Sequence, residues 1–198
     1  MDLNPKVFKT IVFIRHGQYR NDPQRLTSLG KAQSQLAASA VKPLKPIKLY
    51  SSTMPRAIET AKFIAAKVKL KLQAKSFFCE GLLPGTVEFL ETLSKDLSKA
   101  EKVKLLKKMK LAKYQADEAF KFIFKIPNNG QSCEVVVAHG NVIRHWVCKA
   151  LKISEEKWLS MDVINASLTA VRIDSKGKFT LLRFSDCGHI PFKMRTYL

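Results

Sequence analysis

The chain alternates between short runs of apolar, often β-branched residues and longer segments in which apolar residues recur every three or four positions. The short runs are typical of buried strands, and the longer segments are typical of helices that bury one face. The predicted strands are KTIVFIR (residues 9–15), IKLYSS (47–52) and EVVVAHG (134–140). Strands that alternate with helices predict an α/β fold with a largely parallel sheet and right-handed connections.

A segment with helical spacing follows each of these strands. The three segments are RLTSLGKAQSQLAASAV (25–41), PRAIETAKFIAAKV (55–68) and NVIRHWVCKALK (141–152). Thr27 suits the N-cap of the first helix, and Pro55 suits the first turn of the second. Near the end, SLTAVRI and KFTLLRF are joined by four turn-type residues and predict a β-hairpin.

The middle of the chain, residues 87–126, has a different pattern. It is helical in spacing and rich in lysine, and we expect it to be a basic helical insertion within a single domain over residues 1–198. A buried stripe is predicted at Ala116, Ala119, Phe120 and Ile123. For the lysines, a solvated helix face is favoured over binding to a membrane or to an acidic partner.

Composition and charge narrow the choice of function. The 198 residues suffice for one domain, and 35 basic against 16 acidic side chains give a net charge of +19, which attracts anions in general. The lysines are scattered, which favours a solvated surface over a nucleic-acid footprint. The four cysteines form no C-x-x-C pair, which argues against a zinc or redox motif. We see no signal peptide and no transmembrane run, and we expect a cytoplasmic protein.

Two histidine–glycine pairs stand where predicted strands end. His16 follows the first strand and His139 follows the third. Because parallel strands bring their carboxyl ends to one edge of a sheet, both imidazoles are expected at the edge where α/β proteins bind ligands. Arg15 lies beside His16, and Arg56 follows the second strand at the start of the next helix. The sequence therefore predicts two histidines and two arginines in one crevice.

Such a crevice suits a dianionic phosphoryl group. The planar guanidinium of arginine can bind two phosphate oxygens at once, and nearby positive charge favours the neutral, nucleophilic form of an imidazole. Acidic residues are dispersed without the spacing of a metal site. We therefore expect no metal and no cofactor, with charge stabilisation by the arginines and helix N-termini.

Several motifs together carry a resemblance to a known family. They are FIRHGQ, LTSLGKAQ, SSTMPRAIETA, CEG and VVVAHGNVIRHWVCKAL, in this order along nearly the whole chain. This set resembles the histidine phosphatase superfamily, whose fold is phosphoglycerate mutase-like. HGNVIR, NASLT and SDCGHIP are most similar to its mitochondrial Ser/Thr protein phosphatase branch. The resemblance implies a three-layer sandwich, with helices on both faces of a mostly parallel sheet.

The resemblance also implies roles for individual residues. His16 would be the nucleophile that forms a phosphohistidine, and Glu80 would be the general acid, with Glu88 as the alternative. His139 would be a catalytic residue that holds the phosphoryl oxygens. Further contacts to the phosphoryl group are expected from Arg15, Arg56, Gln18 and Asn141.

The predicted function is a metal-independent phosphomonoester hydrolase that acts through a phosphohistidine. The resemblance to the protein phosphatase branch favours a phosphoprotein substrate over a small phosphoester. The spacing agrees, because only about 60 residues separate Glu80 from His139, too few for a large cap. A small-molecule phosphatase or a phosphoglycerate mutase is the alternative. An alternative of another class is a catalytically idle module that binds phosphorylated ligands or nucleic acid. The oligomeric state is left open, a homodimer included.

Overall fold

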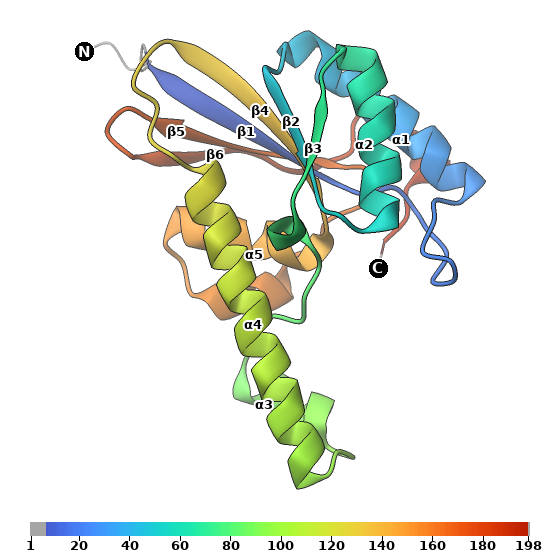
Figure 1. The fold of residues 1–198 in the computed structure, drawn as a ribbon, viewed down its shortest axis with the longest axis vertical. Helices are drawn as coiled ribbons and strands as arrows, with labels where there is room; N and C mark the ends of the chain where they lie inside the picture. Colours follow the sequence, from blue (N-terminus) through green and yellow to red (C-terminus); the bar gives the residue numbers. More distant parts are fainter. Residues whose placement is uncertain (1–6, 198) are drawn as a thin grey trace.

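The computed structural model describes residues 7–197 and is built around a six-stranded sheet in the order β3-β2-β4-β1-β5-β6 (Figure 1). β1, β2, β3 and β4 are parallel, whereas β5 and β6 run antiparallel and form the predicted hairpin. The strands are β1 (Phe8–Arg15), β2 (Lys48–Ser51), β3 (Leu72–Ala74), β4 (Gln131–Ala138), β5 (Leu168–Asp174) and β6 (Phe179–Asp186). The sequence did not predict β3, a short edge strand whose residues are partly or fully exposed.

Two helical layers cover the sheet and confirm the three-layer α/β sandwich. The helices are α1 (Ser28–Val41), α2 (Pro55–Val68), α3 (Val87–Ser94), α4 (Lys99–Ile123) and α5 (Gly140–Leu151). The alternation of side chains along β1 serves both layers: Ile11 and Phe13 pack in the cluster with α4 and α5, and Val12 and Ile14 pack in the cluster with α1 and α2.

The sequence signals for α1 and α2 have clear physical counterparts. The Thr27 hydroxyl accepts a hydrogen bond from the backbone N–H of Gly30 at 3.0 Å, which satisfies a free donor at the start of α1. Pro55 occupies the first position of α2, where a missing N–H costs nothing. Lys69 ends that helix in the left-handed conformation, at φ 59°.

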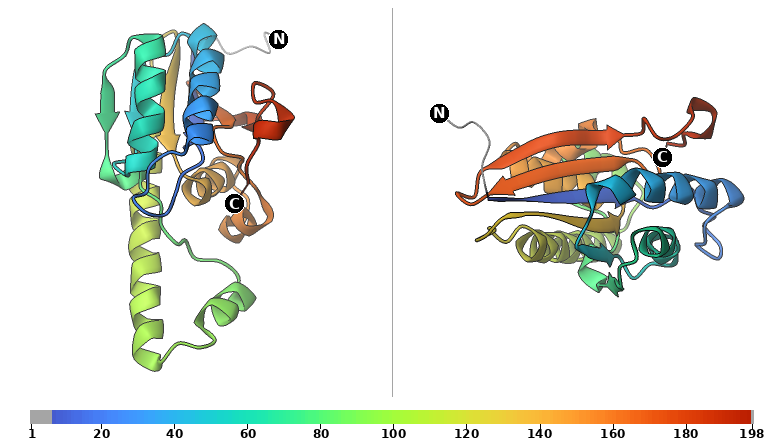
Figure 2. Two further views of the ribbon diagram at one scale, coloured as in Figure 1. Left: turned by 90° about the vertical axis from the view of Figure 1, so that its right-hand side faces the viewer. Right: turned by 90° about the horizontal axis from the view of Figure 1, so that it is seen from above.

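The basic middle region forms two helices rather than one. α3 ends at Ser94, and α4 begins after Ser98, whose side chain forms a capping box with Glu101. We call α3 together with residues 95–111 the arm, because Figures 1 and 2 show it extending away from the sheet. The remainder of α4 packs on the core and buries the predicted positions Ala116, Ala119 and Ile123. No helix within residues 7–197 has the length and apolarity needed to cross a membrane.

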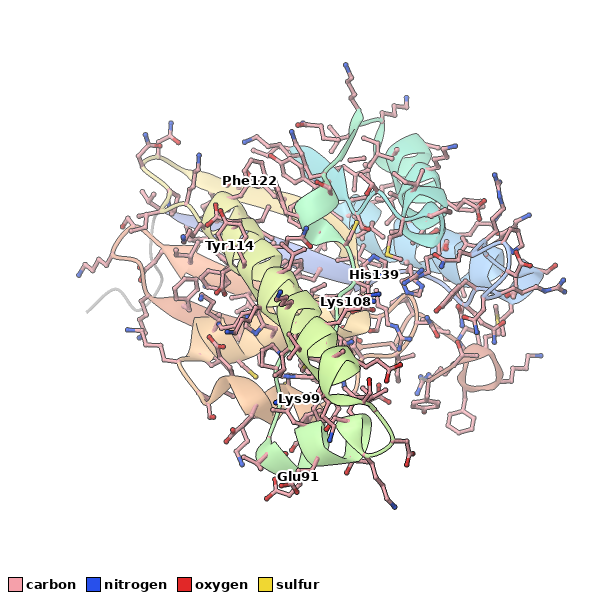
Figure 3. All side chains as sticks on the ribbon, turned by 60° about the horizontal axis from the view of Figure 1, so that its bottom comes forward. Glu91, Lys99, Lys108, Tyr114, Phe122 and His139 are labelled. Carbon is pink, nitrogen blue, oxygen red and sulfur yellow. The ribbon has the colours of Figure 1, made fainter. Side chains whose placement is uncertain are left out.

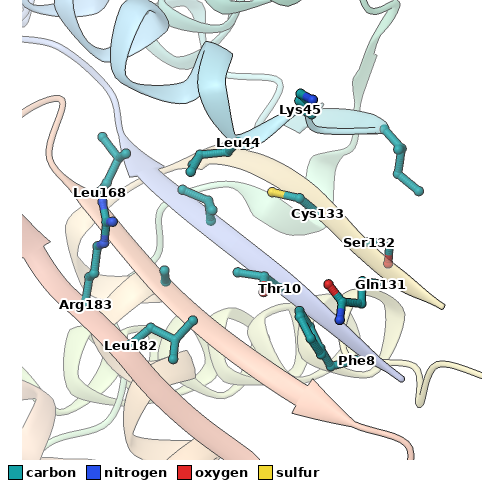
Figure 4. A pocket seen from close by; sticks show the side chains of 13 residues that line it. Phe8, Thr10, Leu44, Lys45, Gln131, Ser132, Cys133, Leu168, Leu182 and Arg183 are labelled. Atoms are coloured by element: carbon teal, nitrogen blue, oxygen red, sulfur yellow. The ribbon is translucent and has the colours of Figure 1, made fainter. Parts of the chain in front are cut away.

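The other end of the sheet carries an apolar groove. Its volume is about 480 Å³, and it lies on the α1 and α2 side, near the amino ends of β1 and β4 (Figure 4). Phe8, Val12, Leu44 and Leu168 supply much of its apolar lining. The groove lies on a face of the sheet, and none of its lining residues is a predicted site residue.

Candidate active site

The strand register places the two histidines side by side. Arg15 is opposite Ala138 in the parallel β1–β4 pair, so the residues that follow them, His16 and His139, leave the sheet at the same level. The backbone N–H of His16 also donates to the Ala138 carbonyl at 3.0 Å. As a result, the two imidazole rings lie with their centroids 5.0 Å apart.

His16 is arranged as a neutral imidazole. Its Nδ1 lies 2.8 Å from the Gly17 carbonyl oxygen, and because a carbonyl only accepts, this contact assigns the proton to Nδ1. Nε2 therefore carries a lone pair, which accepts a hydrogen bond from Arg56 Nε at 3.0 Å. Burial lowers the pKa of His16 to about 3, and the positive charges of Arg15 and Arg56 act in the same direction. The imidazole is uncharged at neutral pH.

The two arginines are buried at the same edge. Arg56 also donates through Nη1 to Gln24 Oε1 at 3.0 Å, and its guanidinium lies 4.4 Å from the centre of the Tyr19 ring. Arg15 donates through Nη1 to the Val163 carbonyl, whereas its buried Nε has no partner within the described residues. Both guanidinium groups thus retain donors for an anion, and neither forms an ion pair with a carboxylate inside 4.0 Å in residues 7–197.

A serine that follows β2 hydrogen-bonds to His139. Its Nε2 lies 2.8 Å from the Ser52 hydroxyl, one residue beyond the end of β2. Its Nδ1 is buried and makes no hydrogen bond within residues 7–197, and the nearest carboxylate oxygen, Glu80 Oε2, is 3.8 Å away. Burial holds the pKa of His139 well below its usual value, and the neighbouring His16, Arg56 and Arg15 act in the same direction. The imidazole is therefore a neutral group with one nitrogen free for a ligand.

Glu80 brings a carboxyl group to the histidines. Its Oε1 accepts a hydrogen bond from the backbone N–H of Asn141, in the first turn of α5, at 3.2 Å. Burial raises the pKa of Glu80 to about 7, although Arg56 and Arg15 oppose the shift. The side chain is still 25% exposed, which leaves it in contact with solvent. A carboxyl that titrates near neutral pH can both donate and accept a proton.

The structure separates the two candidate acids. Glu88 is exposed in the first turn of α3, where its carboxylate receives hydrogen bonds from the Thr86 side chain and its own backbone N–H, contacts that lower its pKa. These contacts are typical of a helix N-terminus. Glu80 is therefore the candidate carboxyl group that the fold places beside His139.

The remaining two predicted contacts are used within the protein. Gln18 Oε1 accepts from the Thr27 hydroxyl at 2.8 Å, which ties the loop after β1 to the start of α1. Asn141 bonds through its side chain to Arg144 and, at 3.4 Å, to the Gly81 carbonyl. Their expected contacts to a phosphoryl group stay a prediction, and the bonds seen here position the two site loops.

Several residues near the site were not singled out from the sequence. Ser52 hydrogen-bonds to His139, and Gln24 and Tyr19 contact the Arg56 guanidinium. Thr60 accepts a hydrogen bond from the Gly17 N–H, and the side-chain amide of Asn165 donates to the His16 carbonyl at 3.0 Å. Ser52 and Thr60 belong to the SSTMPRAIETA motif, and Asn165 belongs to NASLT, so the motifs contained the signal. Gln24 and Tyr19 lie in a loop that has no pattern to mark them.

Gly17 has a steric reason to be glycine. A Cβ on Gly17 would lie 2.4 Å from the carbonyl oxygen of Gly30 in α1. The HG pair after β1 therefore lets the loop approach the helix closely, and this approach fixes the backbone that carries His16.

One further cluster has the composition of a metal site. Among residues 7–197, Asp117, His145 and Glu155 bring three possible ligand atoms within 4.8 Å of one another. Lys149 contacts Asp117 at 2.8 Å, and Lys113 contacts Glu155 at 2.6 Å and Asp117 at 3.2 Å. The two ammonium groups already neutralise these carboxylates, so the cluster is an ion-pair network between α4, α5 and the turn after α5.

The fold and the site together define a class of protein. The family model of the histidine phosphatase superfamily (branch 1) matches residues 11–186, and the chain belongs to this superfamily. The resemblance stated from the motifs is confirmed, and so, at the level of the family, is the expectation of a phosphatase-type enzyme. The chain is also similar to a phosphoglycerate mutase from Plasmodium falciparum, with a TM-score of 0.65 and 24% identity over 97% of this chain and 99% of that one. That likeness concerns the fold.

Two relatives in sequence belong to the predicted branch. The chain is 33% identical to the mitochondrial serine/threonine-protein phosphatase Pgam5 of Caenorhabditis elegans and 29% identical to that of Drosophila virilis. The matches cover 92% and 99% of this chain but 64% and 70% of the relatives. The cytoplasmic location expected from the sequence is wrong by this comparison, because these relatives are mitochondrial. The N-terminal residues on which that expectation rested did not carry enough information to assign a compartment.

Proposed function

We propose that this chain hydrolyses phosphomonoesters through a phosphohistidine on His16, without a metal ion. The observation that carries the proposal is the protonation pattern of the site. His16 has its proton on Nδ1 and a lone pair on Nε2, and Glu80 lies beside the second histidine with a pKa of about 7. A nucleophile and a proton donor are thus present at neutral pH.

The first step forms the phosphoenzyme. When a phosphate binds, Arg56 moves its donor from His16 Nε2 to the phosphoryl oxygens, which frees the lone pair. Nε2 attacks phosphorus, the bond from phosphorus to the leaving oxygen breaks, and Glu80 protonates that oxygen. Arg15, Arg56 and His139 stabilise the charge on the phosphoryl oxygens.

The second step regenerates the enzyme. Glu80, now ionised, accepts a proton from water as the water oxygen attacks phosphorus. The bond between phosphorus and Nε2 breaks, the electron pair returns to the imidazole, and inorganic phosphate leaves. Glu80 is then protonated for the next cycle.

For the substrate, we favour phosphoserine and phosphothreonine in proteins, and for the location, the mitochondrion. Both proposals are supported by the names of the relatives, which are mitochondrial serine/threonine-protein phosphatases. The direction of the arm agrees with this choice, since α3 and the outer part of α4 extend away from the sheet instead of folding back over it (Figure 2).

The test of the chemistry is hydrolysis of p-nitrophenyl phosphate in the presence of EDTA. We expect activity that EDTA leaves unchanged and that His16→Ala lowers by at least about 10⁴-fold. His145→Gln is the matched control, because His145 is a buried histidine that contacts Asp117 rather than the site. Loss of activity in EDTA, or retention of activity in His16→Ala, would contradict the mechanism.

A substrate panel tests the class. Phosphoserine and phosphothreonine peptides, phosphoglycerates and sugar phosphates are compared by kcat/KM under one condition. We expect the peptides to rank first. A higher kcat/KM for a phosphoglycerate, with phosphoryl transfer to a second acceptor, would instead identify a mutase.

A further inference from the structure

The arm and the next turn of α4, residues 112–114, have no role in the proposed reaction, and their surface is unusual. Residues 99–114 contain one acidic side chain, Glu101, which is used in the capping box. In the same stretch there are seven lysines: Lys99, Lys102, Lys104, Lys107, Lys108, Lys110 and Lys113. Within the part of the chain that the structure describes, Lys113 is the one member of this set with a carboxylate inside 4.0 Å.

Like charges three and four positions apart repel each other on a helix surface. Lys104 with Lys107 and Lys108, and Lys107 with Lys110, are pairs of this kind. Lys104 has one acidic neighbour at this spacing, Glu101, whereas Lys107, Lys108 and Lys110 have none within residues 7–197, so the repulsion disfavours the isolated helix. A negatively charged partner would remove it, so the outer part of α4 is complementary to an anionic surface, whereas α3 and residues 95–98 contribute Glu88, Glu91 and Asp96 against one lysine, Lys95.

Large apolar side chains lie exposed among these lysines. Val103 is 47% exposed, Leu106 is 46%, Leu111 is 57% and Tyr114 is 63%. Figure 3 shows this outer part of α4 without cover, from Lys99 past Lys108 to Tyr114. An acidic peptide would satisfy the lysines but would leave most of the apolar groups in water.

The spacing joins both kinds of side chain on one side of the helix. Lys99, Val103, Leu106 and Lys110 follow one another at intervals of four, three and four residues, and Lys102 flanks them. A helix with lysines around an apolar strip is suited to the interface of a bilayer, where the apolar groups enter the headgroup region and the ammonium groups meet lipid phosphates.

We propose that the arm is a docking surface for an anionic lipid bilayer. It holds the protein at the membrane without spanning it. The arm also joins the catalytic edge directly, because a Cβ placed on Gly81, next to Glu80, would lie 2.5 Å from Ala112 Cβ at the base of the arm. The site would thus work close to the bilayer, on phosphorylated groups presented there. The docking itself does not depend on the proposed reaction.

The test is co-sedimentation of the full chain with vesicles at about 0.15 M salt. We expect binding to phosphatidylcholine vesicles that contain about 30% cardiolipin or phosphatidylserine, and none to phosphatidylcholine alone. Lys99→Glu/Lys102→Glu/Lys110→Glu should lower the partition coefficient at least about 100-fold. Val103→Ser/Leu106→Ser should lower it about 10-fold or more, because two apolar groups leave the interface. All five positions are exposed, so the variants are expected to fold.

A charge-matched control separates docking from net charge. Lys31→Glu/Lys62→Glu/Lys67→Glu makes the same change on exposed positions of α1 and α2 and should reduce binding by less than about threefold. Equal loss in both triple variants, or no binding of the wild type to anionic vesicles, would overturn the proposal. An arm variant that binds vesicles normally but has a raised KM for acidic phosphopeptides would assign the arm to substrate docking instead. Hydrolysis of p-nitrophenyl phosphate should be unchanged in all of these variants.

Discussion

The candidate active site and the arm are both basic, but they handle positive charge in opposite ways. At the carboxyl edge of the sheet, Arg15 and Arg56 are buried, and each is held by a carbonyl, an amide oxygen or an imidazole nitrogen. On the arm, lysines are exposed and lack carboxylate partners within the described residues. The first arrangement fixes the direction of a few donors, and the second provides charge density without fixed geometry.

This difference bears on what each region can recognise. Buried, oriented guanidinium groups select the shape of a phosphoryl group and a particular leaving oxygen. Flexible ammonium groups around apolar side chains select a surface, for which position along the surface is unimportant. The net charge of +19 is thus divided between two regions whose basic side chains differ in burial and in fixed geometry.

Replacing Arg56 gives the largest contrast between the regions. Arg56→Lys should lower kcat/KM for phosphomonoesters by about 10²–10⁴-fold, because a lysine keeps the charge but cannot present two oriented donors. Lys107→Ala on the arm removes a full charge and should change kcat/KM by less than about twofold. Steady-state kinetics with p-nitrophenyl phosphate measures both. If Arg56→Lys kept wild-type activity, oriented donors would not be what the site requires.

The proton of Glu80 gives the next largest effect. Glu80→Gln should lower kcat/KM about 10²–10³-fold for a phosphoserine peptide and less than about 10-fold for p-nitrophenyl phosphate, since only the poor leaving group needs protonation. Because the pKa of Glu80 is raised to about 7, its acid form is lost above neutral pH. The wild-type kcat/KM for the peptide should therefore fall as pH rises from 7 to 9.

The pH profile of the Gln variant provides the control. With no ionisable group at position 80, its activity on the peptide should be low and flat over pH 7–9. An unchanged alkaline limb in Glu80→Gln, or equal losses with both leaving groups, would assign the proton donor to another group.

Much of the site could be predicted from the sequence because strand ends are visible in it. An apolar run that stops at RHG or AHG marks both the strand and the residue at its carboxyl end. Parallel pairing of the two strands then brings these residues to the same edge of the sheet. The limits of α1 and α2 were equally readable, since Thr27 and Pro55 act through local hydrogen bonding and φ. These signals involve only neighbours in the chain.

What could not be predicted depends on distant contacts or on weak patterns. The bond between Ser52 and His139 spans 87 positions, and the raised pKa of Glu80 follows from burial that no local pattern encodes. β3 has three residues and little apolar character. The break between α3 and α4 falls in a lysine-rich stretch where a continuous helix and two helices share the same spacing.

The free energy of unfolding gives a smaller and independent test of the buried site, because it depends on the ionisation of Glu80. In the folded protein the pKa of Glu80 is above its unfolded value of about 4.3, so the protonated carboxyl stabilises the fold at low pH, and that contribution is lost as pH rises through 7. Glu80→Gln keeps a neutral group at every pH. Relative to wild type, it should raise the free energy of unfolding by about 1–3 kcal/mol at pH 8 and change it little at pH 4. Urea titrations at the two pH values measure this.

Glu91→Gln, on the exposed face of α3, is the matched control for that experiment. It should shift the free energy of unfolding by less than about 0.5 kcal/mol at either pH. A stabilisation of Glu80→Gln that is the same at pH 4 and pH 8 would mean that ionisation of Glu80 is not the cause.

The smallest expected effect concerns the repulsion along the arm. Lys104→Glu replaces unfavourable contacts to Lys107 and Lys108 by favourable ones but makes the contact to Glu101, three positions earlier, unfavourable, so the net gain is about 0.2–0.5 kcal/mol at low salt. Because the arm has few buried contacts, it can open without global unfolding, so urea titration would miss the change and amide hydrogen exchange in residues 99–108 is the suitable measurement. Slower exchange in Lys104→Glu than in Lys104→Gln, with the difference lost at high salt, would show that charge limits the helix. Equal exchange in the two variants would mean that repulsion among these lysines does not limit the helix.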